Sequence, residues 1–139
     1  MGQGGAPEPD GSPEVRLFIY GTLRSGGGAA GLLGGCRPVG PGVVAGTLYD
    51  LGAYPALVLD GRGPVEGEVW RCPAAALDRL DEYEGVPDGL YLRVPVVVDG
   101  AECWTYAAGP LLEPRLTPER RIPSGRWPPG AGEHGRRGT

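Results

Sequence analysis

The sequence contains one stretch with the pattern of an amphipathic helix, residues 73–84, and this restricts the folds open to the chain. Pro73 suits the first turn of a helix, where its missing N–H costs nothing, and Gly85 suits the position just past the end. The other apolar runs are short and rich in β-branched residues, as strands are. A chain of several strands and one helix is predicted to form a small α+β or barrel-like domain.

Five or six strands are expected around this helix, separated by turns rich in Gly, Pro and Asp. Asp99-Gly100 predicts a hairpin between the last two strands. Pro95 favours an edge strand or a bulge for the first strand of that hairpin, because proline cannot donate to a ladder. The predicted strands are Val15–Tyr20, Val43–Tyr49, Ala56–Leu59, Val65–Trp70, Leu90–Val98 and Ala101–Ala108.

The length of 139 residues and the 40% hydrophobic content suit one domain with its own core. Gly and Pro concentrate at the ends and in the loops. We therefore expect a disordered lead-in at 1–14, a single domain at 15–127 and a disordered tail at 128–139. The N-terminus has no signal-peptide pattern, and no apolar run approaches the roughly 20 residues that cross a bilayer. The protein is expected to be soluble and cytoplasmic, with no membrane partner. The sequence does not indicate an oligomeric state.

Several classes of function are excluded by residue usage. A net charge of −4 argues against nucleic acid as a partner. The chain has no Lys, and its one histidine, His134, lies in a Gly-rich tail, which argues against lysine-based and imidazole-based catalysis and histidine metal sites. Cys36, Cys72 and Cys103 are odd in number and widely spaced. This argues against a zinc site or a disulfide framework and favours a reducing cytoplasm, with the cysteines as small core residues.

One carboxylate of the predicted helix occupies a position that usually carries a Leu. At 100° per residue Leu77, Leu80 and Glu84 form one stripe. A carboxylate on the inward stripe is costly unless it is paired or lines a cavity. The alternative is that the helix frays in its last turn and Glu84 reaches water. The opposite side carries Asp78, Arg79 and Glu82, and Asp81 lies at the margin of the stripe.

A second candidate feature is the segment FIYGTLR, residues 18–24. An apolar strand ends there at Gly21, whose backbone freedom allows a tight turn. Such a turn can direct several backbone N–H groups at one point and so bind an anion. A strand that ends in a Gly turn is also common in domains of any function, so the pattern alone leaves both interpretations open.

Together, YGTLR at 20–24, LDRLDEYEG at 77–85 and GLYLRVPVVV at 89–98 resemble the gamma-glutamyl cyclotransferase-like family. IPSGRW at 122–127 is similar to the closing Gly-x-Trp element of that family, so the resemblance covers roughly residues 17–127. It implies a small mixed β-barrel with flanking helices. The glutathione-related branch of the family commonly has Tyr-Gly-Ser-Asn at the turn, whereas this chain has Tyr-Gly-Thr-Leu at 20–23. The chain therefore resembles the amine-type and bacterial branches more than the glutathione-related one. Arg126 replaces an acid often found in the closing element.

The resemblance also implies a site and a reaction. The enzyme would release 5-oxoproline from a gamma-glutamyl amine, peptide or gamma-glutamyl-acylated metabolite by attack of the substrate's own α-amine, without metal or cofactor. Glu84 would be the general acid and base. The alternative is that the protein is a non-catalytic barrel of the same fold, which only binds a small ligand or a partner. The substrate-binding residues would be Tyr20, Gly21, Thr22 and Leu23 of the turn, with Tyr91 in the pocket. Apart from the resemblance, Tyr106 shares one face of the predicted hairpin with Trp104 and is a further candidate for the pocket, with a place in the hairpin core as the alternative.

Overall fold

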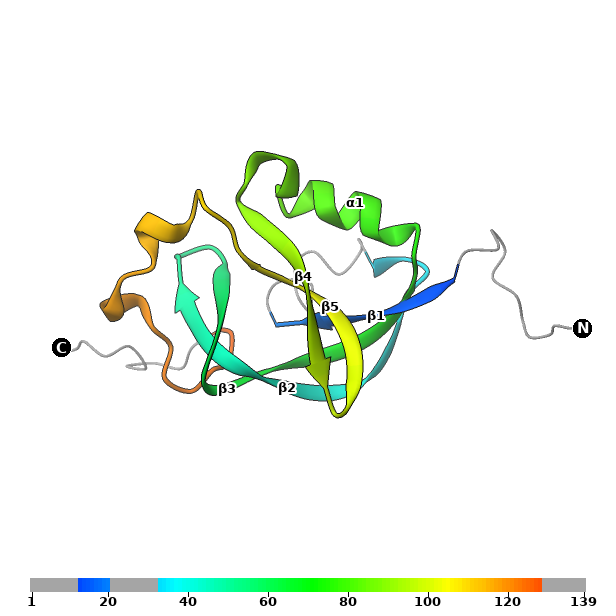
Figure 1. Cartoon of the computed structure of the whole chain (residues 1–139), viewed down its shortest axis with the longest axis horizontal. Helices are drawn as coiled ribbons and strands as arrows, with labels where there is room; N and C mark the ends of the chain where they lie inside the picture. The colour runs from blue at the N-terminus through cyan, green and yellow to red at the C-terminus, as the bar shows by residue number, and fades with distance from the viewer. Residues whose placement is uncertain (1–12, 21–32, 129–139) are drawn as a thin grey trace, which may run out of the picture.

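The structure, a computed structural model, describes residues 13–20 and 33–128 (Figure 1). Five strands form one sheet in the order β2-β3-β1-β5-β4, in which only the β1–β5 pair is parallel. The predicted α+β class is confirmed. The elements are β1 Glu14–Ile19, β2 Arg37–Asp50, β3 Pro55–Pro73, α1 Ala76–Tyr83, η2 Val86–Asp88, β4 Tyr91–Val98, β5 Ala101–Ala108, η3 Glu113–Arg115 and η4 Pro118–Arg120.

The sheet is strongly curved, and α1 lies across one of its faces (Figure 1). Its outer strands β2 and β4 approach each other, since a Cβ at Gly42 would lie 2.8 Å from Cγ1 of Val98. No ladder joins these two strands in the described part of the chain, so the sheet is not closed. The term barrel therefore fits only loosely.

Strand β1 runs through the middle of the sheet and is buried on both faces. Leu17 and Ile19 pack in a core cluster with Leu80 of α1, whereas Phe18 and Tyr20 pack in a second cluster on the other face. This alternation follows from the two-residue period of a strand. The continuous apolar run that predicted a buried strand is thus explained by burial on both sides.

The two strands predicted at 56–59 and 65–70 are parts of the single long strand β3. Thr47 of β2 pairs with Val58, but the neighbouring Gly46 pairs with Gly63, so residues 59–62 leave the ladder as a bulge. The Asp60-Gly61 turn signal was correct as a turn, with Gly61 at φ 76°. It did not end the strand, because pairing with β2 resumes beyond the bulge.

The predicted helix is shorter at its start than the sequence indicated. Pro73 is the last residue of β3 and pairs with Glu14, so α1 begins only at Ala76. At the other end Gly85 has a left-handed backbone (φ 71°), which ends the helix as predicted. Pro95 lies in β4, an edge strand, which confirms that prediction.

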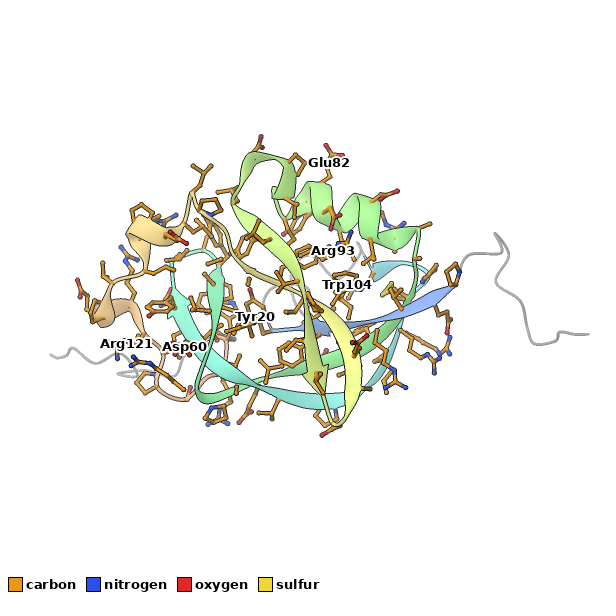
Figure 2. All side chains as sticks on the ribbon, in the orientation of Figure 1. Tyr20, Asp60, Glu82, Arg93, Trp104 and Arg121 are labelled. Atoms are coloured by element: carbon orange, nitrogen blue, oxygen red, sulfur yellow. A yellow bond between two sulfur atoms is a disulfide. The ribbon has the colours of Figure 1, made fainter. Side chains whose placement is uncertain are left out.

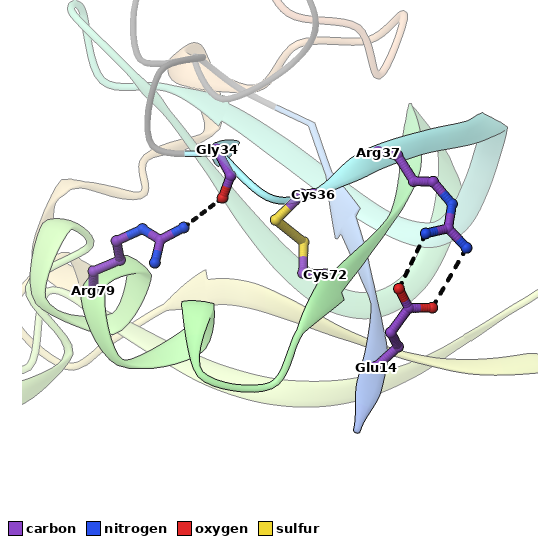
Figure 3. The surroundings of a disulfide bond; sticks show 6 residues. All are labelled: Glu14, Gly34, Cys36, Arg37, Cys72 and Arg79. Atoms are coloured by element: carbon purple, nitrogen blue, oxygen red, sulfur yellow. Dashed lines mark hydrogen bonds and ion pairs between the residues drawn. A yellow bond between two sulfur atoms is a disulfide. The ribbon is translucent and has the colours of Figure 1, made fainter. Parts of the chain in front are cut away.

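The expectation against a disulfide is wrong, because Cys36 and Cys72 are bonded, with 4.2 Å between their Cα atoms (Figure 3). Their distance in sequence hid their closeness in space. Arg37, the first residue of β2, pairs with Arg71 near the end of β3, which brings the preceding and following cysteines together. Nearby, Arg79 of α1 donates to the carbonyl of Gly34 at 2.6 Å. Cys103 is a free, buried thiol, as expected of a core residue.

The closing segment predicted to belong to the domain packs on the sheet. The N–H of Ile122 donates to Leu48 of β2, and the N–H of Glu66 in β3 donates to the carbonyl of Gly125, each at 2.8 Å. The predicted lead-in and tail lie almost wholly outside the described residues. In the described ranges, no helix has the length and apolar character needed to span a membrane.

Candidate active site

Glu84 lies at the C-terminal end of α1 and remains in the last helical turn. Its backbone N–H donates to the carbonyl of the fully buried Leu80 at 2.9 Å, so the end of the helix is not frayed there. The side chain is largely withdrawn from water, and this burial raises its pKa from 4.5 to about 7. Within residues 13–20 and 33–128, no hydrogen bond or ion pair holds the Glu84 carboxylate. The helix end thus presents a half-buried carboxyl that can change its charge near neutral pH.

The charge of Glu84 acts on three buried tyrosines. Tyr20 follows β1, Tyr91 begins β4 and Tyr106 lies in β5, and none is more than 7% exposed. Burial raises the pKa of each phenol, and the negative charge of Glu84 contributes a further rise in all three cases. The fold therefore brings together four residues that the sequence predicted for the site, from four separate elements.

The hydroxyl groups of the three tyrosines each have a defined acceptor. Tyr91 donates to the backbone carbonyl of Pro55 at 2.5 Å. Tyr20 donates to the backbone carbonyl of Tyr106, and the Tyr106 hydroxyl donates to Oδ1 of Asp81 at 2.7 Å. These hydrogen bonds fix the position of each phenol and the direction of its proton.

The structure also places two residues at this site that sequence reasoning did not select, Asp81 and Arg93. Arg93 donates from Nε to Oδ1 of Asp81 at 2.8 Å and from Nη2 to Oδ2 at 3.2 Å. Its guanidinium lies 4.5 Å from the centroid of the Trp104 ring, below α1 (Figure 2). A signal was present: Asp81 precedes Glu84 by three residues on the helix, and Arg93 follows Tyr91 by two on a strand, so each shares a face with a predicted residue.

The other half of the predicted site, Gly21, Thr22 and Leu23, lies outside the described residues, so the anion-binding turn stays a prediction. Among the residues that are described, no three His, Cys, Asp or Glu side chains gather as metal ligands would. The chemistry that the described part offers is proton transfer at Glu84 among fixed phenol oxygens.

Comparison with known proteins decides the family. Residues 17–129 match the family described as gamma-glutamyl cyclotransferase, AIG2-like. The chain belongs to this family. A relative, the gamma-glutamylcyclotransferase family protein YtfP of Escherichia coli K12, is 33% identical over 93 residues, which are 66% of this chain and 80% of the relative.

Solved structures of AIG2-like and related proteins share the fold. The solution structure of ytfP from Escherichia coli has a TM-score of 0.64 at 31% identity and covers 82% of this chain and 96% of that one. An AIG2-like protein from Mus musculus has a TM-score of 0.66 at 22% identity, with 74% and 82% covered, and shows a likeness of fold alone. The family named from the sequence segments is therefore confirmed.

Proposed function

We propose that this protein is a gamma-glutamyl cyclotransferase that releases 5-oxoproline from a gamma-glutamyl amine, peptide or gamma-glutamyl-acylated metabolite. Family membership supports gamma-glutamyl cyclotransferase activity in general. The observation that carries the finer proposal is Glu84, whose burial raises its pKa to about 7. A general acid and base works best when its pKa lies near the working pH, because both protonation states are then available.

The reaction needs only one protein group that exchanges protons. The α-nitrogen of the substrate attacks the γ-carbonyl carbon, so a C–N bond forms within the substrate and closes a five-membered ring. The C–N bond to the amine leaving group then breaks, which yields 5-oxoproline and the free amine. Glu84 takes one proton from the α-ammonium before attack and returns it to the leaving nitrogen. The α-nitrogen loses its second proton once the new C–N bond has formed, and this proton passes by the same carboxylate to the amine, which departs as an ammonium ion. The nucleophile belongs to the substrate, so the step requires a folded geometry and a base, without a cofactor.

The rest of the predicted site has a role in this proposal. The turn at Tyr20 to Leu23 would hold the α-carboxylate of the glutamyl group through backbone N–H groups, which places the substrate between the turn and the end of α1. Tyr91 and Tyr106 would line the pocket. The buried tyrosines also keep water away from Glu84, which preserves the raised pKa on which the proton transfer depends.

The experiment is a turnover assay on Glu84 variants. Wild type, Glu84→Gln and Glu84→Ala are incubated with a panel of gamma-glutamyl amines and dipeptides, and 5-oxoproline is measured by mass spectrometry. Loss of a general base typically lowers kcat by about 10²–10⁴-fold, and we expect a loss in this range with a folded protein. Glu82→Gln is the matched control, because Glu82 is an exposed carboxylate on the same helix. Full turnover by Glu84→Gln would contradict the mechanism.

A wild type that releases no 5-oxoproline from any member of a broad panel would instead favour the alternative that the protein only binds a ligand.

We also propose a small-molecule partner and a cytoplasmic location. The Cys36–Cys72 disulfide of the structure does not fit that location, because disulfides rarely persist in a reducing compartment, and in the cytoplasm the two cysteines would be found as thiols. Alkylation of the protein as it is isolated from cells, followed by mass analysis, tests this location.

A further inference from the structure

The Tyr106 hydroxyl has only one proton to donate, and the structure shows where it goes. A phenol has one O–H and two acceptor lone pairs. Its partner Asp81 is held by the Arg93 guanidinium through two hydrogen bonds, and the Asp81 oxygen that faces Tyr106 accepts the hydrogen bond from the phenol. Burial, together with the hydrogen bond to Asp81, raises the pKa of Tyr106 and keeps the phenol protonated. The proton thus lies between Tyr106 and Asp81, and the remaining lone pairs of Tyr106 can only accept.

Arg93 secures this arrangement from the other side. It lies directly opposite Tyr106 in the β4–β5 ladder, so both side chains leave the sheet on the same face. The stacking of Arg93 on Trp104 limits the orientations of the guanidinium (Figure 2). Asp81 is consequently bound by two donors from neighbouring strands, and its carboxylate has little freedom to turn away from Tyr106.

The other two phenols are in the same state as Tyr106. The Tyr91 hydroxyl donates its hydrogen bond to the backbone carbonyl of Pro55, and the Tyr20 hydroxyl donates to the backbone carbonyl of Tyr106 in β5. Their oxygens have no further proton to donate and can only accept, and the Tyr20 oxygen is already engaged by the backbone of Leu57. A group that binds to such oxygens beside a carboxylate must therefore bring hydrogen-bond donors, and a positive charge favours it there. A primary ammonium group fits both requirements, and a carbonyl oxygen or an oxyanion fits neither.

We infer that Asp81, held by Arg93, is a positioning residue that fixes the Tyr106 hydroxyl as a hydrogen-bond acceptor for a primary ammonium group bound beside Glu84. The inference rests on the proposed function, in which the α-ammonium of the substrate is this group. Tyr106 orients the α-nitrogen toward Glu84 and the γ-carbonyl, and Asp81 acts only through Tyr106.

Asp81→Asn is the informative change, because it keeps the size of the side chain and alters its hydrogen bonding. An amide oxygen holds the Tyr106 proton about half as strongly as a carboxylate does. When the amide NH₂ faces Tyr106, it donates to the phenol oxygen and occupies a lone pair that the ammonium needs. Tyr106→Phe removes the acceptor altogether. Glu82→Gln again serves as the control for loss of a carboxylate from α1.

Binding is measured by calorimetry with a probe pair that the enzyme cannot cleave. L-Methionine sulfoxide carries an α-ammonium and a polar S=O in place of the γ-carbonyl, and 4-(methylsulfinyl)butanoic acid lacks only the ammonium. We expect wild type to prefer the amino probe, and Tyr106→Phe to reduce this preference by about tenfold to a hundredfold, as for a lost hydrogen bond to a charged group. Asp81→Asn is expected to reduce it several-fold, with Glu82→Gln unchanged.

The decisive comparison is the double variant. If Asp81 acts through Tyr106, adding Asp81→Asn to Tyr106→Phe leaves the remaining preference unchanged, and the same non-additivity holds for kcat/KM on a gamma-glutamyl amide. A merely structural Asp81 would lower the preference by the same factor in both backgrounds. That result, or a wild type that binds neither probe or both equally, overturns the inference. The probes are not substrates, so the two proposals can fail separately. Non-additive effects of the two substitutions on probe binding, without any release of 5-oxoproline, would refute the proposed function alone. Release of 5-oxoproline with additive effects would refute this inference alone.

Discussion

Asp81 of α1 and Glu84, which caps the C-terminal end of α1, lie one turn apart and have opposite surroundings. Asp81 accepts hydrogen bonds from Arg93 and Tyr106, which lie on the two neighbouring strands β4 and β5. Glu84 has lost most of its water, and in the described part of the chain no donor replaces that water. The same functional group is thus held by two donors at one position and left able to exchange a proton at the next.

The comparison shows that the donors around a carboxylate decide its role more than the element on which it lies. A carboxylate that accepts several charge-assisted hydrogen bonds keeps one orientation, because turning away would break them. A buried carboxylate without donors is costly to ionise, which brings its pKa toward neutrality. Asp81 therefore suits a positioning role, and Glu84 suits proton transfer.

The largest effect expected from the difference between Glu84 and Asp81 is a loss of enzyme activity at acid pH. Glu84 accepts a proton only when it is ionised, so kcat/KM should rise with pH and level off above its pKa of about 7. Between pH 8 and pH 5 the ionised fraction, and with it kcat/KM, should fall about a hundredfold. The three tyrosines stay protonated over this range, because burial raises their pKa further. A profile measured with a gamma-glutamyl amide that is flat from pH 5 to 8 would contradict the role of Glu84.

A smaller effect concerns stability. The pKa of Glu84 is raised in the folded protein, so the folded state binds the proton more tightly than the unfolded state. The stabilisation from this proton is fully present below about pH 4.5 and is lost as pH rises through about 7. Glu84→Gln should therefore gain about 1–3 kcal/mol in free energy of unfolding, relative to wild type, between pH 4.5 and pH 8. Urea unfolding at both pH values measures this change.

Glu82→Gln is the control for that measurement, because the exposed Glu82 should show a difference from wild type within about 0.5 kcal/mol at either pH. All other titrating groups are common to the three proteins and cancel in the comparison. An equal offset of Glu84→Gln from wild type at pH 4.5 and pH 8 would show that Glu84 titrates in its ordinary range.

Much of the fold followed from local patterns in the sequence. The hairpin around Asp99-Gly100, the buried strand before Tyr20 and the helix end at Gly85 depend on turn chemistry and periodicity, which a sequence displays directly. The Cys36–Cys72 disulfide and the fusion of two predicted strands into β3 depend on pairing between distant segments. Neither can be deduced from spacing along one chain.

The residues of the site also divide into those that local sequence patterns indicated and those that depend on pairing between distant segments. Glu84 stood out because a carboxylate interrupted an apolar stripe. Tyr20 and Tyr91 entered through the resemblance to the family, and Tyr106 through its place on the face of a predicted hairpin. Asp81 did not stand out, since a charged residue at the margin of a helix stripe usually faces water. Its importance comes from Arg93 and Tyr106, whose side chains reach it only after β4 and β5 have paired.

The central claim, that Glu84 carries the proton, is tested most directly by its own titration. Carboxylate ¹³C NMR of glutamate-labelled protein follows each side chain with pH, and the Glu84 signal is identified by its absence from Glu84→Gln. The structure predicts a midpoint near 7 for this signal. A midpoint near 4.5, the ordinary value for glutamate, would contradict the account.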